Sequence, residues 1–396
     1  MRIGVIIDSK LDVGGGFQHV LATVLTLSKQ KKYEFFFFVF SKENLKILEK
    51  YGLEVYFIKS NLWDKFFLFF SYQNWFLWLN NFFNFLISSF EKKIQKFFLD
   101  LIYFPGPSPL ILCLKRHNYV LNVFDLAHRD FPEFPEVNFN YEFEMREIFY
   151  SRVLKKAVAI IADSPAGKEK IVKLYQIDPS RVFYSSYLPS VSLTEKLEID
   201  IHEKYQIDKD YIFYPAQFWS HKNHVYIIDT ISVLRSQGIE ICAVFSGSDK
   251  GNLNFVMKYA KEKGVYDLIK YLGFIPSEDL YSLYKNTIAL VMPTYFGPTN
   301  IPPLEAFLVG VPVIYSDLPE LKEQLGGAGL LCDLKDPASL ADAIERLIND
   351  KKLREQCIIK GKERLEELTR DTLQNSLEII IENYKSKLKC WKEVKL

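Results

Sequence analysis

The stretch "FGPTNIPPLEAFLVGVPVIYSD", residues 296–317, places a polar loop and two prolines directly ahead of a short apolar helix. Thr299 or Asn300 can cap this helix, the prolines fix the backbone of its first turn, and Gly310 ends it. The loop follows the apolar run "IALVMP" at 288–293, and a second apolar run, "VPVIYS", closes the stretch. Apolar runs without alternation are typical of parallel strands that are buried on both faces. The stretch therefore predicts an α/β fold.

Short apolar runs alternate with longer mixed segments along the whole chain. They lie at 3–8, 34–40, 54–58, 101–106, 120–125, 159–164 and 182–187 in the first half, and at 211–216, 241–247, 269–273, 288–293, 311–316 and 329–333 in the second. Helical segments fit between most of them, which is the pattern of a doubly wound sheet. The polar segment 188–210 has little strand signal and is the best linker candidate. We therefore expect two Rossmann-like lobes, with ligands bound by the loops that follow the strands.

The composition narrows the class of protein. The 396 residues are enough for about two to three globular domains. The 50 Lys and Arg residues balance 49 Asp and Glu residues, which argues against a nucleic-acid-binding protein. The five cysteines are scattered and form no CxxC pair, which argues against a disulfide framework and a structural zinc site. The N-terminal "MRIGVIID" lacks the features of a secretory signal, so we expect a cytoplasmic protein.

One segment departs from this soluble pattern. Residues 66–90, "FFLFFSYQNWFLWLNNFFNFLISSF", contain no charged side chain and many aromatic ones. The length suits a membrane span, but Ser, Gln and Asn residues interrupt it. We interpret it as an amphipathic helix that is buried on one side, with a transmembrane helix as the alternative. Together with the tail "YKSKLKCWKEVKL", it predicts peripheral contact with a membrane surface.

Four loops at strand ends carry the candidate chemistry. Glu305 lies in the first turns of the helix after 288–293, where its carboxylate can accept hydrogen bonds from a ribose or simply complement the helix dipole. Lys222 follows the strand at 211–216 and can pair with a phosphate, although, taken alone, this position favours an ordinary solvated surface lysine. Three glycines at 14–16 follow the first strand; they permit close approach of a ligand, or form a flexible turn, but do not make a GxGxxG motif.

The fourth loop, "DLAHRDFPEF", follows the strand at 120–125 and contains Asp125 and His128. A lone histidine is more often structural than catalytic. The sequence shows no Ser-His-Asp order, no HExxH motif and no paired Cys/His cluster. The four loops together favour a phosphorylated ligand.

Three segments resemble the C-terminal lobe of the retaining glycosyltransferases of family 4, which have the GT-B fold of two Rossmann-like lobes facing a central cleft. They are "YPAQFWSHKNH", "YLGFIPSEDLYSLYKNTIALVMPTYFGPTNIPPLEAFLVGVPVIYSDLPEL" and "DPASLADAIERL", within residues 210–350. A looser similarity in the first lobe rests on "GGGFQHV", "FDLAHRDFPEF" and "AVAIIADSPAGKEKIVKLYQI". The variant "FGPTNIPPLEAF" looks like a subgroup seen in polysaccharide and lipopolysaccharide biosynthesis.

The resemblance implies roles for particular residues. It places Glu305 on the ribose of a nucleotide sugar, Lys222 on the diphosphate, and His128 near the reacting sugar on the acceptor side. The remaining donor-binding positions that it implies are Gly15, Gly16, Thr299, Asn300 and Ile301. No metal or other cofactor is expected, because no acidic cluster of the DxD type is present. The expected organisation is an acceptor-side lobe at 1–190, a nucleotide-sugar-binding lobe at 205–370, and a C-terminal helix at 371–396 that crosses back to the first lobe.

Two positions depart from the family pattern. A second carboxylate is common eight residues before Glu305, where this chain has Gly297, and an arginine is common five residues before Lys222, where it has Gln217. The resemblance implies a retaining transferase that moves a hexose-type sugar to a glycan or lipid-linked acceptor in cell-surface polysaccharide synthesis, at the inner face of the cell membrane. The alternatives are a GT-B-shaped nucleotide-sugar epimerase or phosphorylase, and a non-catalytic nucleotide-sugar-binding protein.

Overall fold

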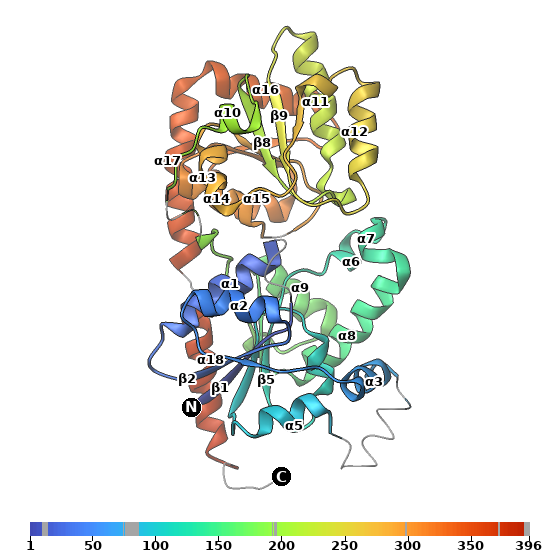
Figure 1. Ribbon diagram of the computed structural model, residues 1–396, viewed down its shortest axis with the longest axis vertical. Coiled ribbons are helices and arrows are strands. Elements are labelled where there is room, and N and C mark those ends of the chain that lie inside the picture. The colour runs from blue at the N-terminus through green and yellow to red at the C-terminus, as the bar shows by residue number, and fades with distance from the viewer. Residues whose placement is uncertain are drawn as a thin grey trace. The chain divides into compact units, whose positions relative to one another are not determined.

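The computed structural model describes the chain except for residues 10–14, 74, 76–86, 192, 194–195, 298, 371–372 and 392–396. The chain forms two compact units (Figure 1). Unit 1 comprises Met1–Asp130, Asn138–Ser186 and Asp371–Leu396, and unit 2 comprises Phe131–Val137 and Tyr187–Arg370. The chain therefore passes between the units four times.

Unit 1 is built on a parallel sheet with the strand order β3-β2-β1-β4-β5-β6-β7. The strands are β1 (Arg2–Ile7), β2 (Glu34–Val39), β3 (Val55–Phe57), β4 (Leu101–Phe104), β5 (Tyr119–Val123), β6 (Ala159–Ala162) and β7 (Val182–Tyr184). Alternate side chains of one strand enter two different cores, because successive residues of a strand point to opposite faces. Val5 and Ile7 belong to one core and Ile6 to the other, so both faces of the sheet are covered.

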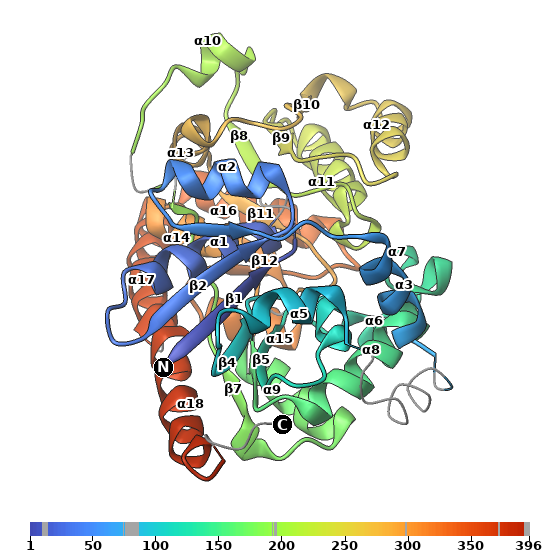
Figure 2. The ribbon, with the colours of Figure 1, turned by 60° about the horizontal axis from the view of Figure 1, so that its bottom comes forward.

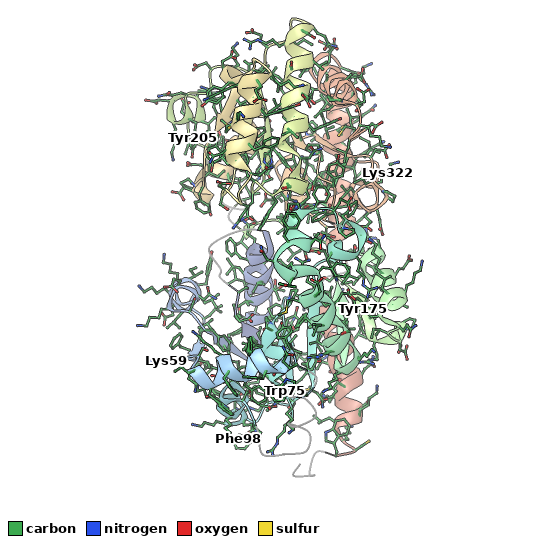
Figure 3. The ribbon with its side chains drawn as sticks, turned by 90° about the vertical axis from the view of Figure 1, so that its right-hand side faces the viewer. Lys59, Trp75, Phe98, Tyr175, Tyr205 and Lys322 are labelled. Atoms are coloured by element: carbon green, nitrogen blue, oxygen red, sulfur yellow. The ribbon has the colours of Figure 1, made fainter. Side chains whose placement is uncertain are left out.

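The helices of unit 1 pack on these two faces. They are α1 (Gly15–Ser28), α2 (Lys42–Lys50), α3 (Leu62–Ser71), α5 (Ser89–Gln95), α6 (Ala127–Asp130), α8 (Glu142–Lys156), α9 (Pro165–Tyr175) and α18 (Leu373–Leu388), with short 3₁₀ turns at Pro109–Cys113, Phe139–Tyr141 and Pro179–Arg181. The last helix, α18, contacts α1 and β7 (Figure 2). Figure 3 shows the side of unit 1 that carries α3. The label Tyr175 in that figure marks the last residue of α9.

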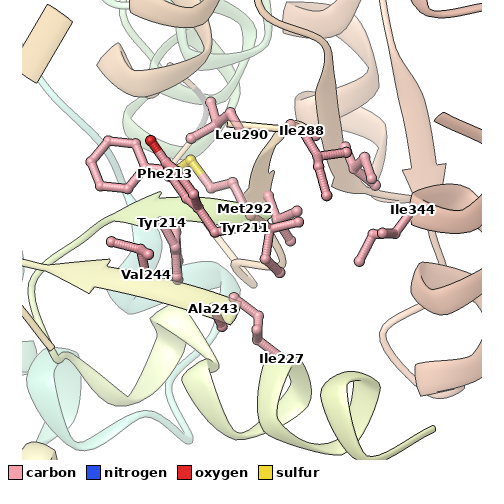
Figure 4. Close-up of a cluster of buried hydrophobic side chains, with 14 of the residues drawn as sticks. Tyr211, Phe213, Tyr214, Ile227, Ala243, Val244, Ile288, Leu290, Met292 and Ile344 are labelled. Atoms are coloured by element: carbon pink, nitrogen blue, oxygen red, sulfur yellow. The ribbon is translucent and has the colours of Figure 1, made fainter. Parts of the chain in front are cut away.

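Unit 2 is built on a second parallel sheet with the strand order β10-β9-β8-β11-β12-β13. The strands are β8 (Tyr211–Pro215), β9 (Cys242–Ser246), β10 (Ile269–Tyr271), β11 (Leu290–Met292), β12 (Val313–Ser316) and β13 (Leu330–Cys332). The residues of the four central strands, β9, β8, β11 and β12, are buried except for Pro215. Figure 4 shows part of the core, in which side chains of β8, β9 and β11 meet Ile227 and Ile344 from the helices.

The helices of unit 2 are α10 (Ile201–Tyr205), α11 (His224–Ser236), α12 (Leu253–Glu262), α13 (Ser277–Lys285), α14 (Ile301–Val309), α15 (Pro319–Leu325), α16 (Pro337–Asn349) and α17 (Lys351–Arg370). Two 3₁₀ turns lie at Ser220–Lys222 (η5) and Tyr266–Leu268 (η6), and the short helix α7 (Pro135–Asn138) lies at the boundary between the units. Asp336 caps α16 as expected, because its side chain accepts a hydrogen bond from the N–H of Ala338 at 2.9 Å.

The predicted α/β architecture of two Rossmann-like lobes is confirmed, and each of the thirteen predicted strands has its counterpart among β1–β13. The chain divides differently from the expected boundaries at two places. Residues 131–137 group with unit 2, and unit 2 begins at Tyr187 because Ile201 and Ile207 are buried in its core. The expected single amphipathic helix at 66–90 is wrong: α3 ends at Ser71, and α5 begins at Ser89 after the extended N-cap residue Ser88. Residues 74 and 76–86 between the two helices lie outside the described part of the chain.

Candidate functional site

The site predicted in the second lobe is built at one edge of the unit 2 sheet. Strands β8 and β11 are parallel neighbours, with Phe213 opposite Leu290. Parallel strands deliver their carboxyl ends to the same edge of a sheet. The loop after β8 leads into η5 and carries Lys222, while the loop after β11 leads into α14 and carries Thr299 and Asn300. The sheet therefore brings together two loops that are far apart in the sequence.

Lys222 and Asn300 are in direct contact. The Nζ of Lys222 donates a hydrogen bond to Oδ1 of Asn300 at 3.1 Å. The Nδ2 of Asn300 donates to the hydroxyl of Tyr315 at 2.6 Å and to the carbonyl of Gly297 at 2.6 Å. These bonds fix the carboxamide with its oxygen toward the lysine. A partly buried cation is thus held beside the start of α14.

The start of α14 offers fewer backbone donors than the sequence suggests. Asn300 is the N-cap residue, but its side chain makes no capping hydrogen bond. Its backbone N–H donates to Oε1 of Gln324 at 3.1 Å, and Nε2 of Gln324 donates back to the carbonyl of Asn300 at 2.7 Å. Pro302 and Pro303 have no N–H. Among the first three helical residues, Ile301 alone therefore carries an N–H that an anion could use.

Glu305 is a buried carboxyl, with 4% of its surface exposed. Its Oε2 accepts a hydrogen bond from the hydroxyl of Tyr284 on α13 at 2.7 Å, and the carboxyl also accepts one from the backbone N–H of Ser190. Burial raises the pKa of Glu305 to about 7, against the opposing effect of these two hydrogen bonds. Buried groups with displaced pKa values are enriched at functional sites, so Glu305 stays a candidate for the donor site.

The structure explains why position 297 holds a glycine. Gly297 has a backbone φ of 111°, a conformation that other residues rarely adopt. A Cβ atom added there would lie 2.8 Å from Oδ1 of Asn300 and 2.9 Å from its Nδ2. The carboxamide of Asn300 thus occupies the space that a side chain at 297 would need. Gln217 is at the second position that differs from the family pattern. Its side chain accepts a hydrogen bond from the indole N–H of Trp219 at 3.0 Å.

Two residues that the sequence analysis did not select organise these loops. The backbone N–H of His221 donates to Oε1 of Glu136 at 2.8 Å, and its Nδ1 donates to the same oxygen. The His221 ring stacks on Phe296 with 3.7 Å between ring centroids, and its carbonyl accepts from the N–H of Tyr295 at 3.0 Å. His221 directly precedes Lys222, so it joins the lysine loop to the loop before α14.

Glu136 reaches unit 2 on the segment 131–137, whose phenylalanines surround the same loop. Phe131 stacks on Phe296, and Phe134 contacts the rings of His221, Tyr295 and Phe296. The sequence signal for this contact is the run "FPEFPEV", in which prolines and aromatic residues flank two carboxylates. The structure is needed to show that Glu136 is the carboxylate that contacts His221.

In unit 1, His128 lies on α6 and is fully buried. Its Nε2 is 2.8 Å from Oε1 of Glu147, and its ring stacks on Tyr150 with 5.9 Å between centroids. Burial lowers the pKa of His128, so the ring is neutral near pH 7. Although burial opposes it, hydrogen bonds from Arg129, Tyr175 and His128 lower the pKa of Glu147 to about 2. His128 is therefore held by an ionised carboxylate, while its Nδ1 has no hydrogen-bond partner among the residues that the structure describes.

The glycine turn opens the helix α1 of unit 1. The helix begins at Gly15, and Gly14 lies outside the described residues. A Cβ atom at Gly16 would lie 3.3 Å from the ring of Phe124, the first residue after β5.

Asp8, the first residue after β1, accepts a hydrogen bond from the hydroxyl of Ser108, and burial raises its pKa to about 6. Asp8 is a further candidate at this edge of the sheet, and its signal in the sequence is its position directly after a strand.

The described residues contain no group of three or more His, Cys, Asp or Glu side chains arranged to hold a metal ion. Whether the activity needs a metal stays a prediction.

Comparisons with known proteins agree with this arrangement. Residues 198–364 match the family model described as Glycosyl transferases group 1. This segment is therefore similar to the group 1 glycosyl transferases. It contains η5, α13 and α14, and hence Lys222, Asn300 and Glu305. The family resemblance predicted from the sequence is confirmed.

The individual curated relatives share low sequence identity with this chain. The chain is 27% identical over 216 residues to the O-antigen chain mannosyltransferase B of Escherichia coli, which covers 52% of this chain and 56% of that protein. The chain thus spans about half the length of the curated relatives it matches.

Solved structures match nearly the whole chain. The glycosyltransferase of Rickettsia africae ESF-5 has a TM-score of 0.69 at 14% identity and covers 98% of both chains. Anabaena Alr3699/HepE in complex with UDP and glucose has a TM-score of 0.70 at 14% identity, with 96% of this chain and 99% of that chain covered. These likenesses show the fold, and it is the predicted GT-B fold of the glycosyltransferases.

Proposed function

We propose that this group 1 glycosyl transferase chain is a retaining enzyme, which moves a hexose-type sugar from a nucleotide diphosphate sugar to a glycan or lipid-linked acceptor. The observation that carries the proposal is the grouping of Lys222, Asn300 and Glu305 at the β8 and β11 edge of the sheet, inside the segment that matches the family. A cation next to a helix start suits a diphosphate, and a buried carboxyl in the same helix suits the hydroxyl groups of a ribose.

The proposed chemistry needs stabilisation of a leaving group. The bond between the anomeric carbon and the diphosphate oxygen breaks, and the diphosphate leaves with the electron pair. Lys222 and the N–H of Ile301 stabilise the negative charge that develops there. The acceptor hydroxyl attacks the anomeric carbon from the face that the diphosphate leaves and gives its proton to the departing diphosphate oxygen, so the configuration is retained without a protein nucleophile. His128 acts on the acceptor side, and Gly15 and Gly16 give the donor room near α1.

We propose that this reaction needs no divalent metal, because Lys222 and the helix start supply the positive charge. Transfer should therefore continue in the presence of EDTA, measured as incorporation of labelled sugar. Complete loss of transfer that added manganese restores would overturn this part of the proposal.

The relative named above is an O-antigen chain mannosyltransferase, and this supports a role in cell-surface polysaccharide synthesis. The acceptor of such a pathway is a glycan or a lipid-linked glycan. We accordingly place the protein in the cytoplasm, at the inner face of the cell membrane, where it would make peripheral contact.

The test is to incubate the full chain with a panel of radiolabelled nucleotide sugars, with and without a lipid-linked acceptor, and to determine the anomeric configuration of the product by NMR. The proposal predicts acceptor-dependent transfer with the configuration of the donor. Conversion of the nucleotide sugar without an acceptor would indicate an epimerase, and phosphate-dependent release of the sugar would indicate a phosphorylase. Binding of a nucleotide sugar without turnover would indicate a non-catalytic protein.

A further inference from the structure

Helix α3 of unit 1 buries two polar residues and exposes four large apolar ones. Asp64, Phe67 and Ser71 form its buried face, at the spacing of one side of a helix. Oδ1 of Asp64 accepts a hydrogen bond from the N–H of Phe90 at 2.8 Å, and the hydroxyl of Ser71 donates to the carbonyl of Phe67 at 2.7 Å. Two polar residues of α3 are thus buried and hydrogen-bonded inside the protein.

The opposite face of α3 exposes large apolar side chains. Leu62 is 84% exposed, Phe69 66%, Phe66 47% and Trp63 41%, and Trp75 just beyond the helix is 55% exposed. The ring of Trp63 stacks on that of Phe66 with 5.5 Å between centroids. Figure 3 views this side of unit 1, with Trp75 labelled. Contiguous exposed apolar side chains of this kind mark an interaction surface.

In the segment that carries α3 and α5, the exposed charges have one sign. Of the charged residues between positions 57 and 98, the two acidic ones, Asp64 and Glu91, are buried. Glu91 accepts hydrogen bonds from the backbone N–H groups of Lys115 and Arg116. The others are lysines that are exposed or partly exposed, namely Lys59, Lys65, Lys92, Lys93 and Lys96. A chain with a net charge of only +1 therefore presents a cationic apolar surface here.

We propose that this surface, made by the outer face of α3, Trp75 and the lysines of α5, binds the surface of a bilayer that contains anionic lipids. Exposed Trp and Phe side chains suit the headgroup region, and the lysines suit negatively charged headgroups. A second copy of the chain fits less well, because a symmetric dimer would bring the same lysines face to face. Within the described residues, no helix has the length and apolarity needed to span a membrane, so this surface would lie on the bilayer.

The test measures co-sedimentation of the full chain with vesicles of phosphatidylcholine alone and of phosphatidylcholine mixed with phosphatidylglycerol. The double variant Phe66→Ser/Phe69→Ser removes two outward rings, and Phe255→Ser/Phe274→Ser is the matched control, because those rings are also exposed but lie in unit 2. We expect the first variant to lower the partition coefficient about tenfold or more, and the control to leave it unchanged.

The charge contribution is tested with Lys92→Gln/Lys96→Gln, against the control Lys351→Gln/Lys352→Gln on α17. Binding to the anionic vesicles should fall by about fivefold for each lysine of α5 that is removed, and binding to phosphatidylcholine should not change. Thermal melts check that each variant is folded, which is expected for exposed positions.

Three results would overturn the proposal: no preference for the anionic vesicles, equal effects of the α3 variant and its control, or a dimer in sedimentation velocity that the α3 variant dissociates while vesicle binding is absent. The measurement uses no nucleotide sugar, so its outcome is independent of the proposed transferase activity.

Discussion

Replacing Glu305 by Gln tests whether this buried carboxyl is an ionisable group that recognises the donor. Burial raises its pKa in the folded chain to about 7, from the ordinary value of 4.5 that a glutamate keeps in the unfolded chain. The folded chain therefore binds more protons between these two pH values, and the free energy of unfolding falls as the pH rises through this window. A difference of about 2.5 pKa units corresponds to roughly 3 kcal/mol. Glutamine cannot ionise, so the variant should not show this loss.

The assay is urea denaturation of both proteins from about pH 5 to about pH 8, the range that spans the titration. Relative to the natural protein, Glu305→Gln should gain up to about 3 kcal/mol toward the alkaline end, and the two should converge toward the acid end. Glu355→Gln, at an exposed position on α17, is the control and should follow the natural protein. Parallel profiles for Glu305→Gln and the natural protein would refute the reasoning.

The same substitution should weaken the binding of a nucleoside diphosphate. At alkaline pH we expect a loss of roughly 1.5–3 kcal/mol, because a charged acceptor of the ribose hydroxyls becomes a neutral one. In the natural protein the affinity should also fall as the pH drops below about 7, where Glu305 becomes protonated. Calorimetric titration of both proteins measures this. An unchanged affinity would remove Glu305 from the site, even if the stability profiles behave as expected.

Three further substitutions test neighbouring parts of the account. Lys222→Gln should weaken diphosphate binding by roughly 1.5–3 kcal/mol in the same calorimetric assay, and an equal affinity would exclude a phosphate contact. Gly297→Ala should cost about 1–3 kcal/mol of stability in urea denaturation, because its φ is 111° and the Asn300 carboxamide fills the adjoining space; an unchanged midpoint would show that the loop can adopt another conformation. His128→Ala should reduce turnover far more than donor affinity, whereas equal losses in both would indicate that its contact with Glu147 is purely structural.

The sequence predicts the fold well because a buried parallel strand has a simple sequence pattern, a short run of apolar residues. Each run of apolar residues without alternation became a strand, and "IALVMP" and "VPVIYS" became the neighbours β11 and β12. The order of the strands in each sheet has no such local signal. The grouping of residues 131–137 with unit 2 was also not foreseeable, because no sequence spacing connects Phe131, Phe134 and Glu136 to the loops that they contact in space.

The site was predictable in its residues but not in its geometry. Proline and glycine positions located the loop before α14, and the position of Lys222 after a strand located the cation. Hydrogen-bond partners such as Gln324 and Tyr284 come from other helices, α15 and α13, and no spacing in the sequence connects them to Asn300 or Glu305. The burial of Glu305, which sets its pKa, is likewise a property of tertiary packing.

The most direct test of the central claim is a crystal structure of the chain with a bound nucleoside diphosphate, chosen by calorimetric screening. The account predicts that a diphosphate oxygen accepts a hydrogen bond from Nζ of Lys222, in the place now taken by Oδ1 of Asn300 or beside it, and that the ribose hydroxyls donate to the carboxylate of Glu305. A nucleotide bound elsewhere in unit 2, with no contact to Lys222 or Glu305, would contradict it.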